Sequence, residues 1–199
     1  MDNEKLKDKI DEIRALMYKG RRSAIISSKS LFVWSITALL ATEISPLILS
    51  KFGNYINYFF LLIFYIIVFG TAIIAQRKFD VQVTKELGEI LDYTVFLLTK
   101  VWITTVGLGV LFTIFISLHG GIEYVYAVWL LFVGIGIYFS GFFSMVIFEK
   151  YGLILICIGL ASFLIPKDQA MLVGQRIVEL FVCGGLIVLG IYVKKKYKW

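Results

Sequence analysis

Six runs of apolar residues, each near the length that crosses a lipid bilayer, dominate this chain of 199 residues. The hydrocarbon core of a bilayer is about 30 Å thick, which an α-helix spans with about 20 apolar residues. Charged residues make up 17% of the chain, against about 25% in a soluble domain. We therefore expect an all-α fold, a polytopic transmembrane helical bundle with six spans. The expected spans are residues 31–49, 58–75, 97–118, 125–147, 151–165 and 173–193.

The basic residues predict the orientation of these spans. With six spans, 17 of the 20 Lys and Arg residues fall on the side that carries both termini. Basic residues are retained on the cytoplasmic side of a membrane. The sequence thus predicts a cytoplasmic amphipathic segment at 1–30, a membrane domain at 31–193 and a basic cytoplasmic tail at 194–199. The same distribution explains the net charge of +6, so no nucleic-acid partner is expected.

The N-terminal segment has its own apolar stripe. Leu6, Ile10, Ile13 and Met17 recur at helical spacing. Three interpretations remain open. A helix lying on the membrane surface is favoured by the basic residues at 19–22. A short coiled coil between subunits and a helix packed on the cytoplasmic ends of the bundle are the alternatives.

The third and fourth spans resemble each other at a constant offset of 27 residues. The matches are Val101-Trp102 with Val128-Trp129, Val106-Gly107-x-Gly109 with Val133-Gly134-x-Gly136, Phe112 with Phe139, Phe115 with Phe142, and Ser117 with Ser144. Adjacent spans cross in opposite directions, so a true repeat would be inverted, as in many transporters. A chance likeness between two spans rich in Gly and Phe is the alternative.

Small residues in the same two spans predict close helix packing, since membrane helices associate where backbones can approach. We expect this hairpin at the centre of the bundle and the bulky span 58–75 at its perimeter. Cys157 and Cys183 lie within spans, where small packing residues are expected rather than a disulfide or metal pair. The expected packing positions are Gly107, Gly109, Gly134, Gly136, Ser140, Gly141 and Ser144.

Glu43 lies within the first span, and a carboxylate inside a span suggests a functional site. Pro46 and Lys51 favour a helix that ends around Ile44. Glu43 would then lie at the outer interface, and an intramembrane position is the alternative. Two further boundaries are predicted, a separate amphipathic helix within 77–94 and a tight turn at 149–150.

Five polar residues are expected near the outer face. Arg176 and Glu179 are three residues apart, so they can pair on one face of a helix. Separate interfacial charges are the simpler interpretation. The functional one is the mouth of a small permeation or binding pocket, with Glu43 and Glu179 as proton or cation ligands and Arg176 as counter-charge. The candidate cluster is Glu43, His119, Glu123, Arg176 and Glu179.

Catalytic and cofactor motifs are missing from the sequence. It has no HExxH, GxSxG or P-loop pattern. His119 and Glu123 are not expected to form a zinc site, because the chain has no second histidine. We expect no enzyme, no cofactor and no metal.

One set of residues carries a resemblance. Lys100-Val101-Trp102, Gly107-x-Gly109, Trp129-Leu130, Gly134, Gly141, Gly152 and Gly159 occur within residues 77–165. This pattern resembles a loosely defined set of uncharacterised small polytopic bacterial inner-membrane proteins. The resemblance implies a bacterial plasma membrane protein with several spans, and it carries over no catalytic residue.

Two functions fit these observations. The first is a non-catalytic structural or regulatory membrane protein, which assembles as a homo-oligomer or with a membrane or cytoplasmic partner through its small-residue faces. The second is a small transporter or channel with an outward-facing polar cluster. The lipid bilayer is the surrounding medium in both.

Overall fold

The computed structural model describes residues 26–51, 54–86 and 93–197, and within them all regular structure is helical. The expected all-helical fold is therefore confirmed. In chain order the elements are α2 (Ser28–Lys51), α3 (Asn54–Glu86), α4 (Tyr93–Leu118), the 3-10 turn η1 (Ile122–Tyr124), α5 (Val125–Phe143), α6 (Val146–Ser162), α7 (Lys167–Ile177), the π-helical segment η2 (Val178–Gly184) and α8 (Gly185–Tyr197). The amphipathic segment expected at 1–30 lies almost wholly outside the described residues.

Five stretches of the described chain are helical, long and apolar enough to cross a membrane. They are Ser28–Ile48, Phe59–Gln82, Leu97–Leu118, Ile122–Phe143 and Lys167–Lys196. The remaining long helix, α6, has 17 residues, which is at the short end of the range for a membrane span.

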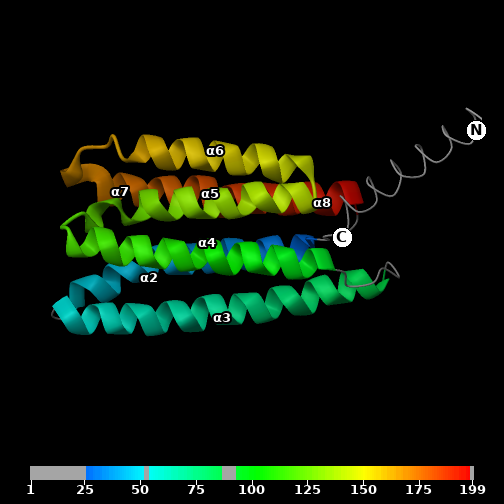
Figure 1. Cartoon of the computed structure of the whole chain (residues 1–199), viewed down its shortest axis with the longest axis horizontal. Coiled ribbons are helices and arrows are strands. Elements are labelled where there is room, and N and C mark those ends of the chain that lie inside the picture. Colours follow the sequence, from blue (N-terminus) through cyan, green and yellow to red (C-terminus); the bar gives the residue numbers. More distant parts are fainter. Residues whose placement is uncertain (1–25, 52–53, 87–92, 198–199) are drawn as a thin grey trace, which may run out of the picture.

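The helices run antiparallel along the bundle (Figure 1). Helix α2 begins and α8 ends at the same end, where α3 leads toward α4 and α5 turns into α6 (Figure 1). The opposite end holds the α2–α3, α4–α5 and α6–α7 connections. Lys29 in the first turn of α2, Lys150 in α6 and the lysines at 194–196 in α8 thus belong to the end where α2 begins and α8 ends. The basic residues therefore gather at that end, as their sequence distribution suggests.

Helix α5 is the centre of the bundle, and its closest partner is α6. Gly134 and Gly141 of α5 and Gly152 and Gly159 of α6 each lie against backbone atoms of the other helix. Both pairs are spaced by seven residues, which is two helical turns, so the same contact recurs along the pair. Without side chains at these positions the two backbones can approach closely.

The centre of the bundle is therefore the pair of α5 and α6, and not the expected hairpin of the third and fourth spans, α4 and α5. We expected both the third and the fourth span at the centre, but α4 is largely exposed, and its described buried residues are Leu98, Thr105 and Gly109. Helix α3 is more exposed still, with Ala72 as its one buried residue among those described. That exposure agrees with the perimeter position expected for the second span.

Helix α2 continues through Pro46 to Lys51, so the expected end near Ile44 is wrong. Proline lacks the N–H that would bond the carbonyl four residues earlier. That carbonyl belongs to Thr42, and it accepts a hydrogen bond from the Tyr126 hydroxyl at 3.3 Å instead. A neighbouring helix thus supplies the donor that proline removes, which is how membrane helices tolerate proline.

The last pass begins at Lys167 rather than at residue 173, and it contains the π-helical segment η2. Two carbonyls in this segment bond side chains of other helices. The Ser35 hydroxyl of α2 donates to the Cys183 carbonyl at 2.8 Å, and the Tyr151 hydroxyl of α6 donates to the Phe181 carbonyl. Both carbonyls of this irregular segment thus have a hydrogen-bond donor from a neighbouring helix.

Two other expected boundaries are also wrong. Helix α3 is continuous to Glu86, so no separate helix begins at residue 77, because the sequence from 71 to 86 contains no Gly or Pro to interrupt it. The turn between α5 and α6 falls at Ser144 and Met145. Residues 149 and 150 therefore lie within α6.

Candidate functional site

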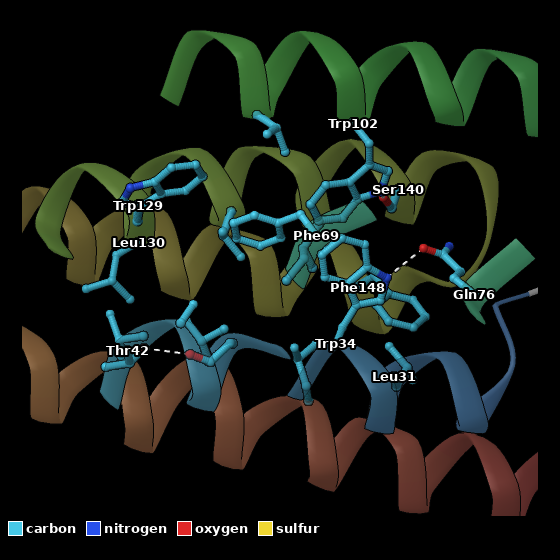
Figure 2. Close-up of a pocket in the computed structure, with 18 of the residues that line it drawn as sticks. Leu31, Trp34, Thr42, Phe69, Gln76, Trp102, Trp129, Leu130, Ser140 and Phe148 are labelled. Carbon is cyan, nitrogen blue, oxygen red and sulfur yellow. Dashed lines mark hydrogen bonds between the residues drawn. The ribbon is translucent and has the colours of Figure 1, made fainter. Parts of the chain in front are cut away.

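A cavity of about 120 Å³ lies at the centre of the bundle. All six passes of the described chain contribute side chains to its wall, and Figure 2 shows the aromatic ones facing inward from several helices. No charged side chain of the described residues lines it. The volume is close to that of cavities that hold a single benzene ring.

Four aromatic rings form a continuous chain along the wall. The rings of Trp102 and Trp34 stack with centroids 5.9 Å apart. Trp34 and Phe69 are 6.1 Å apart, and Phe69 stacks on Trp129 at 6.0 Å. These separations are within the range of favourable aromatic pairs. The chain of rings joins α4, α2, α3 and α5, so the cavity wall is also a major contact between helices.

Two contacts between α4 and α5 are reciprocal. A Cβ on Gly136 would lie 3.0 Å from the Trp102 ring, and a Cβ on Gly109 would lie 3.3 Å from the Trp129 ring. Trp102 and Trp129 are equivalent positions of the 27-residue repeat, and so are Gly109 and Gly136. Trp102 of α4 thus packs on Gly136 of α5, and Trp129 of α5 packs on Gly109 of α4. The matched positions therefore make the same contact in both directions between the antiparallel helices α4 and α5.

The indole N–H groups around the cavity have different environments. Trp34 Nε1 donates to Gln76 Oε1 at 2.6 Å, and Trp102 Nε1 donates to Ser140 Oγ at 3.1 Å. Trp129 Nε1 is shielded from solvent and has no hydrogen-bond partner among the described residues. An unpaired buried donor is rare in proteins and calls for a partner.

Tyr126 closes one end of the cavity. Its side chain is 6% exposed and lines the cavity together with Thr42. Its hydroxyl donates to the Thr42 carbonyl, so the ring bridges α5 and α2. Thr42 precedes Glu43, and the lining residue Val178 precedes Glu179. The carboxylates of the expected cluster therefore lie directly beyond this end of the cavity.

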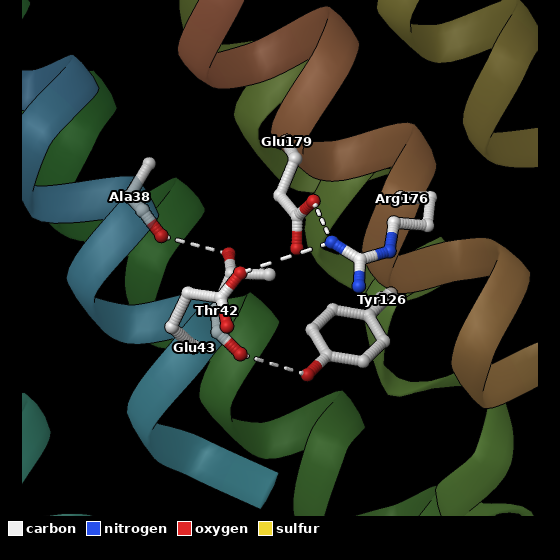
Figure 3. A network of polar contacts seen from close by, with 6 residues as sticks. All are labelled: Ala38, Thr42, Glu43, Tyr126, Arg176 and Glu179. Carbon is white, nitrogen blue, oxygen red and sulfur yellow. Dashed lines mark hydrogen bonds and ion pairs between the residues drawn. The ribbon is translucent and has the colours of Figure 1, made fainter.

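Three members of the expected cluster meet there. Arg176 and Glu179 form an ion pair at 2.6 Å between Nη1 and Oε2, which confirms the pairing expected from their spacing. Arg176 Nη1 also lies 4.0 Å from Glu43 Oε1. Figure 3 shows the guanidinium on one side of both carboxylates, with a contact to each, and beside the Tyr126 ring. We call these three residues, Glu43, Arg176 and Glu179, the outer network.

The other two members of the cluster lie elsewhere. Glu123 pairs with Lys167 at 3.6 Å, and Lys167 also donates to the Gly120 carbonyl at 2.7 Å. His119 follows the last residue of α4 and is exposed, and its Nδ1 lies 2.8 Å from the Phe115 carbonyl of that helix. The single expected cluster is therefore two separate groups and a lone histidine. The sequence did not predict the pair of Lys167 and Glu123, because the two residues are far apart in the chain. The α6–α7 connection brings them together.

A second polar group lies at the opposite end of the bundle. Asp80 Oδ1 of α3 accepts hydrogen bonds from the Ser30 hydroxyl at 2.7 Å and from the Ser27 backbone N–H at 3.1 Å. The Ser27 hydroxyl accepts from the Ser30 N–H at 3.1 Å and so caps α2. Sequence reasoning missed Asp80, because it assigned the residue to a connector. Its bonds tie the beginning of α2 to α3.

The expected packing positions differ in what they contact. Gly109 and Gly136 pack on indole rings, while Gly134 and Gly141 pack on the α6 backbone. Ser140 and Ser144 are buried. Gly107 is exposed, and a Cβ there would meet no described atom within 4 Å, so it takes no part in the helix packing expected of it. Its side of α4 faces away from α5.

Within the described residues, no three His, Cys, Asp or Glu side chains are placed to hold a metal ion. The two cysteines are free, with Cys183 buried and Cys157 exposed. Comparison with protein-family models, with curated proteins and with solved structures finds no match to this chain.

Proposed function

We propose that this chain is a non-catalytic integral membrane protein that binds a small amphiphilic molecule and carries it between the two faces of the membrane. The apolar part of the ligand occupies the aromatic cavity, and its polar part lies at the outer network. The observation that carries this proposal is the uncharged cavity lined by all six passes, with charged residues immediately beyond one end.

The chemistry of the wall favours an apolar group. Indole, phenyl and aliphatic side chains make up most of the lining, and such surfaces bind rings and alkyl chains by excluding water. Charged groups lie beyond both ends of the cavity: the outer network beyond Thr42, and Asp80 beyond Gln76, where it accepts hydrogen bonds from Ser27 and Ser30. A molecule with an apolar body and a polar end matches both surroundings at once.

Carriage is supported by the relation between α4 and α5. Inverted repeats let a transporter adopt two states that expose one central site to opposite faces. The reciprocal contacts of Trp102 with Gly136 and of Trp129 with Gly109 are an inverted relation at the wall of this cavity. A bare hydrocarbon would cross a bilayer unaided, so the need for a carrier also favours an amphiphile.

We further propose six spans, with α6 as the short fifth one, in a bacterial inner membrane, with both termini in the cytoplasm. The six antiparallel passes of the described chain (Figure 1) and the gathering of basic residues at the end where α2 begins and α8 ends support this topology. The outer network would then lie at the outer face.

A structural or regulatory role, through assembly on small-residue faces, is the second candidate. Its main support in the sequence was the set of glycine and serine positions in the third and fourth spans. Gly134, Gly136 and Ser140 instead contact groups within this chain, so they leave little free surface for a partner. We therefore favour the binding function.

Tryptophan fluorescence tests the proposal directly. Three of the four tryptophans line the cavity, so a Trp199→Phe variant in lipid nanodiscs emits from the cavity alone. Bromobenzene is a ring of suitable size whose heavy atom quenches indole emission. We expect saturable quenching, superimposed on the linear quenching from probe dissolved in lipid. Linear quenching alone would overturn the proposal.

Two alanine variants provide the control. Ala41 lines the cavity, and Ala161 is exposed on α6. In the Trp199→Phe background, Ala41→Leu fills part of the cavity and should abolish the saturable component. Ala161→Leu adds the same side chain outside the cavity and should leave that component unchanged. Equal effects of the two substitutions would mean that the probe binds elsewhere.

A further inference from the structure

The unpaired N–H of Trp129 suggests what the ligand carries into the cavity. The other two indoles of the wall donate to protein oxygens, Trp34 to Gln76 and Trp102 to Ser140. Trp129 Nε1 is equally shielded from solvent and has no partner among the described residues. Leaving such a donor unpaired costs more than a typical hydrogen bond contributes, because its hydration is lost without replacement.

The hydroxyls of the wall form hydrogen bonds with other protein groups, and no described group is a hydrogen-bond partner of Trp129 Nε1. The Tyr65 hydroxyl, for example, is bonded to Ser45 Oγ at 2.8 Å. Ser140 Oγ accepts from Trp102 and donates to the Gly136 carbonyl. Thr42 Oγ1 donates to the Ala38 carbonyl, and the Tyr126 hydroxyl donates to the Thr42 carbonyl. The acceptor that would pair with Trp129 is therefore most simply supplied by the occupant of the cavity.

The charge of that acceptor is constrained by the wall. The lining contains no Lys or Arg among the described residues, so an anionic oxygen would be buried without a counter-charge, at a large desolvation cost. A neutral oxygen, from a ketone, ester, alcohol or ether, pairs with an indole N–H at no such cost.

The position of the nitrogen gives the ligand a direction. In Figure 2 the Trp129 nitrogen lies at the end of its ring that is remote from Phe69, toward the same end of the cavity as Thr42. That is the end beyond which the outer network lies. The opposite part of the wall is formed by the stacked rings of Trp34 and Trp102.

We infer that the cavity selects a ligand whose apolar ring or chain carries a neutral acceptor oxygen, which bonds Trp129 Nε1 and orients the polar end toward the outer network. Trp129 is then the specificity-determining residue of the site. This inference rests on the proposed binding function, and it adds the chemical class of the ligand.

Two probes of nearly identical shape isolate the hydrogen bond. Cyclohexanone presents a carbonyl oxygen, and methylenecyclohexane replaces that oxygen by a CH₂ group. The protein, labelled with ¹⁵N in its four indoles and placed in nanodiscs, is titrated with each probe. We expect cyclohexanone to move the Trp129 indole N–H resonance downfield in a saturable manner, and methylenecyclohexane to cause no downfield movement of that resonance.

Substitution of Trp129 supplies the decisive comparison. Trp129→Phe assigns the resonance by its loss and removes the donor while keeping an aromatic ring, so binding in this variant is followed on the remaining indoles. We expect the preference for cyclohexanone over methylenecyclohexane to fall about three- to tenfold, which is the value of one hydrogen bond. Trp102→Phe is the matched control, because the N–H it removes already has a protein acceptor, and it should keep the preference.

The outcomes separate this inference from the proposed function. A saturable response to both probes with equal affinity, or a preference that survives Trp129→Phe, would overturn the inference and leave the binding function standing. If neither probe gives a saturable response at any indole of the wild-type protein, the binding function itself fails.

Discussion

The ring of Trp102 lies over Gly136, and the ring of Trp129 lies over Gly109, one helix supplying the tryptophan and the other the glycine in each case. The same two positions of the 27-residue pattern thus form the contact in both directions between these antiparallel helices. Both tryptophans also line the cavity, as do Val106 and Val133, one turn further along each helix. The wall of the cavity is thus built in part from one sequence pattern used twice in opposite orientations.

Gly136→Leu should displace the Trp102 ring and disrupt the cavity, because a Cβ at position 136 already lies 3.0 Å from that ring. We expect a loss of about 1–3 kcal/mol in the free energy of unfolding, as for other overpacked sites. Reversible unfolding in mixed micelles measures it. Gly107→Leu on the neighbouring helix meets open space and should have little effect. Equal losses would show that the reciprocal contact is unimportant.

The α5–α6 pair should be even less tolerant. Gly152→Ala would place a Cβ against the Tyr138 backbone and the Gly134 carbonyl, neither of which can move without separating the helices. We expect a loss of about 3 kcal/mol or more, measured by the same unfolding assay. Gly70→Ala in α3 is the control, since nothing lies within 4 Å of its added methyl and alanine favours the helix by up to about 1 kcal/mol.

Pro46 and Tyr126 should be energetically coupled. Tyr126→Phe removes the donor to the Thr42 carbonyl, which proline leaves without its helical partner, and we expect a loss of about 0.5–1.5 kcal/mol. In a Pro46→Ala background the alanine N–H can bond the same carbonyl, so Tyr126→Phe should cost less. A double-mutant cycle measures the difference. If Tyr126→Phe lowers the free energy of unfolding equally in both backgrounds, the Tyr126 hydroxyl does not replace the N–H that Pro46 lacks.

Carriage predicts that a buried cavity position becomes accessible. In a background with Cys157 and Cys183 replaced by alanine, Ser140→Cys places a thiol in the cavity wall, where Ser140 is 1% exposed. A membrane-impermeant thiol reagent applied from outside should label it slowly, and bound ligand should protect it. Ser162→Cys is the control, because Ser162 is 3% exposed and lies outside the cavity. Failure of position 140 to label from either side would argue for a static binding site.

The two carboxylates of the outer network should differ in their contribution to folding. Arg176 is 67% exposed at its side chain, and Glu43 is 52% exposed, so water screens their interaction, whereas Glu179 is only 17% exposed in its shorter pair with Arg176. We expect Glu43→Gln to change the free energy of unfolding by about 0.5 kcal/mol or less, and Arg176→Gln to lower the unfolding midpoint, because it leaves the Glu179 carboxylate without its ion-pair partner. Binding of an amphiphile with a polar end should weaken in both variants. A large loss of stability with unchanged binding would assign these residues a structural role instead.

The existence of the helices was predictable from the sequence, because long apolar runs in a membrane have few alternatives to a helix. Their irregular parts were not. Whether α2 passes through Pro46 depends on Tyr126, which lies 84 residues from the carbonyl it bonds. The carbonyls of the π-helical segment likewise depend on partners far away, such as Ser35, which is 148 residues from Cys183. Local patterns hold no information about such partners.

The candidate site was predictable only in its local part. The spacing of Arg176 and Glu179 was enough to predict their ion pair. The cavity was missed, because its rings come from four helices whose rotation about their own axes is set by packing. One signal was present in the repeat, since Trp and Val recur four residues apart at 102 and 106 and again at 129 and 133. Read as one face of each helix, those positions would have indicated a shared aromatic wall.

The short helix α6 has a consequence for the lipids around the bundle. Its 17 residues give a length of about 26 Å, whereas the 33 residues of α3 give about 50 Å. The extra length of α3 is polar, because its stretch from Gln76 to Glu86 includes five charged residues, so it would extend beyond the hydrocarbon core of a bilayer. A bilayer in contact with α6 would meet an apolar wall lower than the roughly 30 Å of its hydrocarbon core. Acyl chains beside α6 would have to shorten, which favours thin or fluid bilayers on that side of the bundle.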